Sequence, residues 1–239
     1  MGEARLKQSR ADFSVGIGFP CGATVPWQTA MSLARTVHLL AVLGIPANIH
    51  VIAGSSDVVI ARDVVLDNYL ADAEKFMFWI DSDMSWRPED FIRVLRLTKE
   101  LGLVSAAYPL KRDPPECIIN FADTEPVVQP HGCVEILSTG LGFTCVRRDL
   151  IDAFAATKEK MMHDGNGRMI IDAFRRDKKL RADGLMHGAG EDACFFEDMR
   201  ALGFKAWLDP TISLGHTGSK EYCMPMQDLT LSLPAVQAA

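Results

Sequence analysis

The sequence predicts an α/β protein with a doubly wound, mostly parallel sheet and a small antiparallel extension. Apolar runs of strand length alternate with segments of helical period between residues 13 and 108, which is typical of successive β-α units. Glycine and proline separate these segments, as the ends of helices require. The run at residues 75–83 is a nearly continuous apolar strand that ends in two aspartates, Asp81 and Asp83.

The first part of the chain predicts three β-α units and a fourth strand. Gly44 is expected to end the first helix, because glycine suits the left-handed position after a helix. Ser55 or Ser56 is expected to cap the second helix, and Pro88 to begin the third, which ends before Gly102. The expected strands cover residues 13–19, 47–53, 75–80 and 103–108, and the helices cover 26–43, 57–70 and 88–101.

Regular periodicity weakens beyond residue 110. Residues 117–121 and 133–137 resemble short antiparallel strands, and residues 158–190 form the least regular part, rich in glycine, methionine and charge. Further strands are expected at 142–146, 205–208 and 212–214, helices from residue 149 and at 191–202, and a tail over 221–239. One domain is expected to span residues 1–239, because a chain of 239 residues that is 48% hydrophobic builds a single sizeable core.

Composition excludes several classes of protein. The net charge of −6 provides no global basic field for nucleic acid. The six cysteines contain no C-x-x-C pair, which makes zinc and a disulfide framework improbable and fits a reducing cytoplasm. The polar N-terminus resembles no signal peptide, and no apolar stretch is uninterrupted enough for a membrane span. The sequence also lacks a phosphate loop, a complete dinucleotide fingerprint and a G-x-S-x-G elbow.

The aspartates at residues 81 and 83 are the main candidate site. Asp81-Ser82-Asp83 could form only a turn and a helix cap, as such pairs often do. However, the carboxyl edge of a buried strand is where open α/β sheets bind their ligands. Carboxylates are hard ligands suited to Mg²⁺ or Mn²⁺, which commonly accompany phosphates. The motif therefore predicts a divalent metal and a phosphorylated ligand.

Other candidate residues each have a structural alternative. Arg62 could bind a diphosphate or lie on a solvated helix face near Asp63. Glu191 and Asp192 could supply a general base or interact with a helix dipole. His216 and Lys220 could bind a metal and a diphosphate, or serve the structure alone. The basic run of residues 175–181 could form a solvated surface or receive an anionic acceptor.

Taken in order, these motifs resemble the GT-A glycosyltransferases, which use nucleotide-sugar donors, and in particular the family 2-like, standalone bacterial or phage type. The similarity runs from about residue 13 to residue 220. It rests on Gly18-Phe19-Pro20, the Ala61-Arg62 helix, Ile80-Asp81-Ser82-Asp83, Thr139-Gly140-Leu141-Gly142-Phe143, Gly190-Glu191-Asp192 and Gly215-His216-Thr217-Gly218.

The resemblance implies roles for these residues. Residues 13–110 would form the nucleotide-binding half and residues 111–220 the acceptor half. Asp83 and His216 would bind Mn²⁺ or Mg²⁺, with Asp81 holding the metal or the ribose. Inverting and retaining transfer both stay open, and in the favoured inverting transfer Asp192, beside Glu191, would be the base. Donor-binding residues would be Pro20, Cys21, Arg62, Asp81, Ser82, Gly140, Leu141 and Lys220, and acceptor residues Arg175, Arg176, Lys178 and Lys179.

The partners follow from the same resemblance. The donor would be a nucleotide-sugar, with UDP as the most frequent nucleotide, and the acceptor a glycan, a metabolite or a hydroxymethylated DNA base. The location would be the cytoplasm of a bacterium, or of its host for a phage protein. Three alternatives stay open: a haloacid-dehalogenase-type phosphotransferase with Asp81 as nucleophile, a nucleotidyltransferase, and a non-catalytic module that binds sugar nucleotides.

Overall fold

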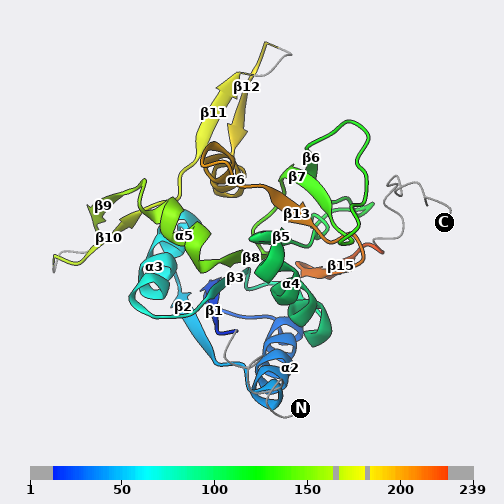
Figure 1. The fold of residues 1–239 in the computed structure, drawn as a ribbon, viewed down its shortest axis with the longest axis horizontal. Coiled ribbons are helices and arrows are strands. Elements are labelled where there is room, and N and C mark those ends of the chain that lie inside the picture. The colour runs from blue at the N-terminus through cyan, green and yellow to red at the C-terminus, as the bar shows by residue number, and fades with distance from the viewer. Residues whose placement is uncertain (1–12, 164–166, 181–183, 226–239) are drawn as a thin grey trace.

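An eight-stranded sheet forms the centre of the molecule (Figure 1). The computed structural model describes residues 13–163, 167–180 and 184–225. Three neighbouring strands come from the predicted β-α units: β1 (Val15–Cys21), β2 (Ala47–Ala53) and β3 (Phe76–Ile80). The others are β5 (Leu103–Ser105), β6 (Asn120–Phe121), β7 (Val134–Ser138), β8 (Phe143–Arg147) and β13 (Ala206–Leu208), and the order is β2-β1-β3-β8-β5-β13-β7-β6.

The sheet is mixed, although most of its strands share one direction. β7 and β8 run against the other strands of this sheet, so its mostly parallel character is confirmed. The antiparallel pairing is not confined to an extension, because β8 lies between β3 and β5 and is antiparallel to both. A strand buried on both faces is an apolar run whichever way it points, so the sequence could not predict its direction.

Helices cover both faces of the sheet (Figure 1). α2 (Trp27–Leu43) and α4 (Pro88–Leu101) pack on one face, where Leu40 and Phe91 join one buried cluster. α3 (Val58–Ala71), α5 (Arg148–Ala155) and α6 (Glu191–Ala201) pack on the other, where Leu66 and Phe195 join a second cluster. Within the described part of the chain, no helix combines the length and apolar character that crossing a membrane needs.

The helix ends predicted at Gly44 and Pro88 are confirmed, whereas the residue that caps α3 differs from the prediction. Gly44 ends α2 in the left-handed conformation, with a φ of 68°, and Pro88 begins α4. Asp57 caps α3, where the sequence predicted Ser55 or Ser56, because its carboxylate accepts a hydrogen bond of 3.0 Å from the Val59 amide. The Ser55 hydroxyl instead hydrogen-bonds the backbone carbonyl of Asp57.

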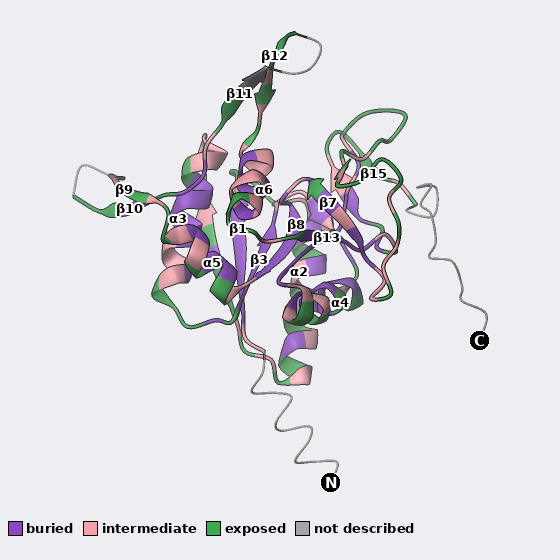
Figure 2. Ribbon diagram, turned by 45° about the horizontal axis from the view of Figure 1, so that its top comes forward, coloured by how far each residue is buried: buried purple, intermediate pink, exposed green. Residues whose placement is uncertain are grey.

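The region expected to be irregular, residues 158–190, contains two β-hairpins (Figure 1). One pairs β9 (Glu159–Met162) with β10 (Met169–Asp172), and the other pairs β11 (Asp177–Leu180) with β12 (Met186–Ala189). Both extend away from the sheet and are largely exposed (Figure 2). Apart from Ile170 and Ile171 of β10, which are buried, the hairpins bury little apolar surface, so their sequences show little of the alternation that normally indicates a strand.

A second, three-stranded sheet joins β4 (Met84–Ser85), β14 (Gly215–Thr217) and β15 (Glu221–Cys223). The expected strand at 212–214 is wrong: Ile212 and Leu214 are buried, but pairing begins only at Gly215, opposite Ser85. β15 occupies the first residues of the expected tail, and residues 226–239 of that tail lie outside the described residues.

Candidate functional site

A cavity of about 290 Å³ lies at the carboxyl ends of β1, β2 and β3. Its walls come from the loops after these strands, the start of α3, the start of α6 and β14. This is the edge where open α/β sheets bind ligands. Of the residues singled out from the sequence, the cavity brings together Pro20, Cys21, Arg62, Asp81, Ser82, Asp83, Glu191 and His216.

Arg62 is the buried positive charge of the cavity. Its side chain is 1% exposed, and its guanidinium faces three carboxylates. The Nη2 atom lies 2.9 Å from Asp81 Oδ1 and 3.4 Å from Asp192 Oδ1, and the Nε atom lies 3.5 Å from Glu191 Oε1. Burial acts to lower the pKa of Arg62, but the three carboxylates outweigh it and raise that pKa.

Two polar atoms of Arg62 are buried and lack a hydrogen-bond partner among the described residues. They are Nη1 and Nε, of which Nε forms the ion pair with Glu191. Buried donors are normally paired, and an unpaired one commonly indicates a missing ligand or water. A guanidinium suits phosphate and carboxylate oxygens, because its donors form a planar fork. Arg62 therefore does not lie on a solvated helix face, and its ion-pair partners are Asp81, Glu191 and Asp192 rather than Asp63.

Asp81 is held from two sides. Besides Arg62, the Tyr108 hydroxyl lies 3.4 Å from Asp81 Oδ2 and accepts a hydrogen bond of 3.2 Å from the Gly142 amide. Gly142 and Gly140 leave room for this arrangement. A Cβ at Gly142 would lie 2.6 Å from Asp81 Oδ2, and one at Gly140 would lie 2.1 Å from the Tyr108 hydroxyl. These glycines are therefore required by close packing around Tyr108.

Asp83 and His216 form a pair of facing ligand atoms. His216 Nδ1 lies 2.8 Å from the Pro109 carbonyl oxygen, to which it donates, and this contact directs Nε2 toward Asp83 Oδ1, 3.3 Å away. Two neighbouring ligands of an octahedral Mg²⁺ or Mn²⁺ ion, each about 2.1 Å from it, lie about 3 Å apart. A backbone carbonyl that orients the second ring nitrogen is also typical of metal-binding histidines.

A lysine that the sequence analysis missed neutralises Asp83. Lys111 Nζ forms an ion pair with Asp83 Oδ2. Burial acts to raise the pKa of Asp83, but His216 and Lys111 lower it below the usual value, so the carboxylate is charged. The separation of 28 residues between Lys111 and Asp83, across an irregular loop, gave no sequence signal of this contact.

Asp192 has the electrostatics of a base. Desolvation by burial raises its pKa to about 7, with Asp81 and Glu191 acting in the same direction and Arg62 and the Leu141 amide acting against it. A carboxylate with a pKa near the working pH is well suited to general-base chemistry. Asp192 lies at the start of α6, where Glu191 precedes it.

Several predicted residues lie elsewhere. Lys220 is not part of the cavity wall, and its Nζ atom lies 2.6 Å from Asp113 Oδ2. The Leu141 side chain is fully buried in the core, so only its backbone can contact a ligand. Gly140 supports Tyr108 rather than lining the cavity.

The predicted acceptor residues belong to β11 and the segment before it. Arg175 is tied to Asp177, Glu197 and Asp198, with its Nη2 atom 2.8 Å from Asp198 Oδ1. Arg176 lies 3.4 Å from Asp57, at the cap of α3. Lys178 is exposed, and the Lys179 side chain lies outside the described residues.

The structural role of Asp63, next to Arg62, was not predicted from the sequence. It is fully buried, and its Oδ1 atom accepts hydrogen bonds of 2.9 Å from the amides of Ala173 and Phe174. It therefore attaches the segment between the two hairpins to α3. The sequence signal was the adjacent pair Arg62-Asp63 on a helix with little amphipathic character, which indicates a helix buried on several sides.

Comparisons with known proteins give only distant likenesses. No family model and no curated protein matches the chain. Among solved structures it is similar to the 4-diphosphocytidyl-2C-methyl-D-erythritol synthase of Anaerococcus prevotii, with 10% identity and a TM-score of 0.33 over 66% of this chain and 82% of that chain. It is also similar to a glycosyltransferase involved in glycosylation of the major capsid of PBCV-1, with 11% identity and a TM-score of 0.28 over 59% and 62% of the two chains. At such TM-scores neither likeness carries an argument.

Proposed function

We propose that the chain is a metal-dependent glycosyltransferase that moves a sugar from a nucleotide-sugar, with UDP as the expected nucleotide, to an acceptor hydroxyl. The main support is the convergence of Asp83, His216 and Arg62 around one cavity, with Asp192 3.4 Å from Arg62. These residues supply a metal-ligand pair, a buried cation and a base with a raised pKa, which are the groups that such a transfer needs.

Asp83 and His216 would hold Mn²⁺ or Mg²⁺, with Asp81 close by. The ion would act as a Lewis acid that stabilises negative charge on the diphosphate. Its two ligands are already ordered, since Pro109 fixes the imidazole and Lys111 contacts the second oxygen of Asp83. When the donor binds, we propose that Lys111 exchanges its contact with Asp83 for a diphosphate oxygen.

Arg62 would bind the donor through Nη1, which lacks a hydrogen-bond partner among the described residues. Its other contacts, to Asp81 and Asp192, hold the guanidinium in place, so little ordering is needed on binding. Pro20, Cys21 and Ser82 complete the wall beside it. The predicted diphosphate contact of Lys220 is replaced in this proposal by Lys111.

The proposed role of Asp192 as the base gives the following bond changes. The acceptor oxygen attacks the anomeric carbon while the bond from that carbon to the diphosphate oxygen breaks. The acceptor proton passes to the Asp192 carboxylate, and the nucleoside diphosphate leaves with the electron pair. Because the attack comes from the face opposite the leaving group, the product has inverted configuration. General-base assistance of this kind contributes about 10²–10⁴-fold.

The acceptor would lie toward β11, where Arg176 and Lys178 are exposed and Arg175 is already paired with carboxylates. A glycan, a metabolite and a hydroxymethylated DNA base all offer the required hydroxyl. Neutralising Arg176 and Lys178 together should raise the KM for an anionic acceptor and leave donor affinity unchanged. An unchanged acceptor KM would remove this surface from the proposal.

The central test is donor turnover. Purified protein is incubated with a panel of nucleotide-sugars, with Mn²⁺, Mg²⁺ or chelator, and release of the nucleoside diphosphate is measured with and without candidate acceptors. We expect metal-dependent release that is lost in Asp83→Ala and Asp192→Asn and kept in Asp123→Asn, an exposed loop carboxylate outside the cavity.

The same preparations separate the alternatives. Metal-dependent hydrolysis of an aryl phosphate that Asp81→Asn abolishes would support the phosphotransferase and overturn the proposal. Both Asp81 oxygens have partners, Arg62 and Tyr108, which argues against a nucleophile there. Nucleotide-sugar binding without release in any acceptor mixture would indicate a binding module.

A further inference from the structure

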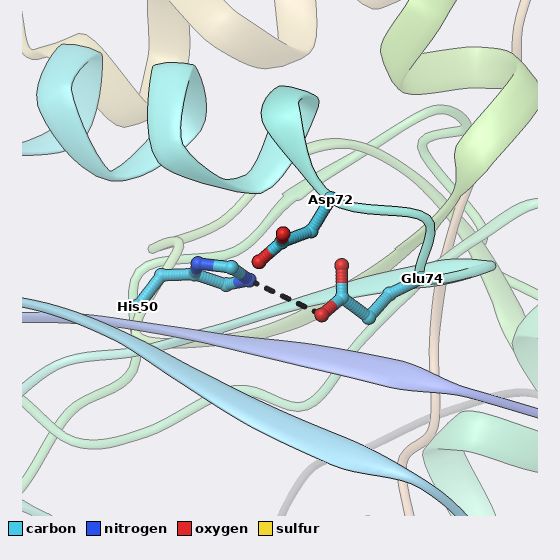
Figure 3. Close-up of side chains that lie close together, drawn as sticks. All are labelled: His50, Asp72 and Glu74. Carbon is cyan, nitrogen blue, oxygen red and sulfur yellow. Dashed lines mark ion pairs between the residues drawn. The ribbon is translucent and has the colours of Figure 1, made fainter.

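Three ionisable side chains meet outside the cavity, near the start of β3. They are His50 of β2, Asp72 at the end of α3 and Glu74 in the loop that enters β3 (Figure 3). One ligand atom from each lies within 4.8 Å of the others. Figure 3 shows the Asp72 carboxylate directed toward both His50 and Glu74, so the three groups face a common point.

Two members of this cluster are buried with an unsatisfied polar atom. His50 is 7% exposed and Glu74 is 5% exposed. His50 Nε2 and Glu74 Oε2 lack a hydrogen-bond partner among the described residues, and Nε2 lies 3.7 Å from Glu74 Oε1, beyond hydrogen-bond distance. Burying a carboxylate with an unpaired oxygen costs folding free energy. The unpaired Glu74 oxygen therefore indicates that a partner is missing.

The surroundings hold these side chains in position. The Asn48 amide donates a hydrogen bond to Glu74 Oε1, and the Tyr69 hydroxyl donates one of 3.0 Å to the Glu74 backbone carbonyl. The His50 ring packs edge-on against Tyr69, with ring centroids 5.8 Å apart. A Cβ at Gly16 would lie 2.9 Å from His50 Nε2, so glycine leaves the space that the ring occupies.

We propose that His50, Asp72 and Glu74 bind a divalent transition-metal ion, with Zn²⁺ as the representative ion. One imidazole nitrogen and two carboxylates suit Zn²⁺ and its neighbours, whereas Ca²⁺ prefers oxygen ligands alone. Ligand atoms about 2.1 Å from one ion lie about 3–4 Å apart, so a small inward rotation of the exposed Asp72 side chain closes the site.

This site is distinct from the proposed catalytic one. Glu74 precedes β3 and Asp81 follows it, which places the two at opposite ends of the strand, roughly 20 Å apart at about 3.3 Å per residue. The ion joins β2, the end of α3 and the entry to β3. Its role is to fix α3, the helix that carries Arg62 at its other end.

The experiment measures metal binding in the full chain. Asp83→Ala/His216→Ala serves as background, so that an ion at the cavity cannot contribute. Isothermal titration with Zn²⁺ should show one equivalent in this background, and adding Asp72→Asn or Glu74→Gln should weaken binding at least tenfold. Both substitutions keep the side-chain shape, and Asp72 is exposed, so the fold should survive.

A control variant and a second metal ion test whether the bound ion contacts these three side chains. Asp67→Asn, which changes a carboxylate of the same helix that pairs with Arg168, should bind Zn²⁺ as the background does. Co²⁺ bound at the site should give visible absorption bands that His50→Gln shifts or removes. Binding that Asp72→Asn and Glu74→Gln leave unchanged, or equal affinity for Ca²⁺ and Zn²⁺, would overturn the proposal. Neither outcome depends on glycosyl transfer.

Discussion

Arg62 of α3 and Asp192 of α6 are 130 residues apart in the sequence, and Arg62 Nη2 lies 3.4 Å from Asp192 Oδ1. The same nitrogen contacts Asp81. One buried guanidinium therefore links the strand that presents the aspartates to the helix that presents the proposed base. Replacing Arg62 should therefore lower both the free energy of unfolding and the affinity for the proposed donor.

Replacing Arg62 with Met should destabilise the protein by about 3–5 kcal/mol at pH 7.5, because three partly buried carboxylates lose their partner. The loss should shrink toward pH 5, because Asp192, whose pKa is raised to about 7, takes up a proton. Urea unfolding at both pH values measures it. Arg112→Met, which breaks the exposed pair with Glu116, is the control and should change stability by less than about 1 kcal/mol. Equal losses at both pH values would contradict this account.

If Asp192 is the base, kcat/KM should rise with pH and level off above a pKa of about 7, because only the deprotonated carboxylate accepts the acceptor proton. Asp192→Asn should lower kcat by about 10²-fold or more, with little change in donor affinity. A pH profile of transfer between pH 5 and 9 measures the first effect. A flat profile would exclude Asp192 from this role.

Gly140→Ala should displace Tyr108, because the added Cβ would lie 2.1 Å from its hydroxyl oxygen. We expect a loss of about 1–3 kcal/mol in unfolding free energy, as for overpacking, and weaker donor binding through Asp81. Gly188→Ala is the matched control, since no atom lies within 4 Å of its added Cβ. Similar behaviour of the two variants in thermal unfolding and donor titration would argue against the packing explanation.

Asp63 should make stability depend on pH. Burial raises its pKa to about 6, although the amides of Phe174 and Ala173 act to lower it. The folded state then binds the proton more tightly than the unfolded state, so this contribution falls as pH rises from about 4 to 6, by at most about 1.4 kcal/mol per pH unit. Asp63→Asn should lose that slope in urea unfolding, and Asp67→Asn should keep it.

Sequence reasoning recovered most of the fold because its signals are local. The apolar run that ends at Asp81, the glycine at residue 44 and the proline at residue 88 each specify a local conformation. The direction of β8 and the two hairpins were missed, because strand direction and weakly buried pairing leave little trace in composition.

The candidate site was recovered less evenly. Asp81 and Asp83 follow β3, and the rule that ligands bind at carboxyl ends applies to them directly. His216 lies within β14 of the smaller sheet, so that rule does not account for its position. Lys111 could not be separated from Lys220 by spacing, since the contact of Lys111 with Asp83 depends on how an irregular loop folds back. Tyr108 and Asp63 are polar residues whose importance comes from contacts with residues distant in the sequence, Asp81 and Phe174, which only the three-dimensional structure provides.

The hairpin of β11 and β12 pairs only with itself among the described strands, whereas the cavity residues lie on α3, α6, β14 and the ends and loops of the central strands. Insertions, exchanges and charge changes can therefore accumulate in the hairpin without disturbing the central sheet. If the chain transfers a sugar as proposed, its descendants could change their acceptor while the donor site stays the same. The β11–β12 hairpin could likewise be exchanged for another hairpin in an engineered variant while the rest of the fold is left unchanged.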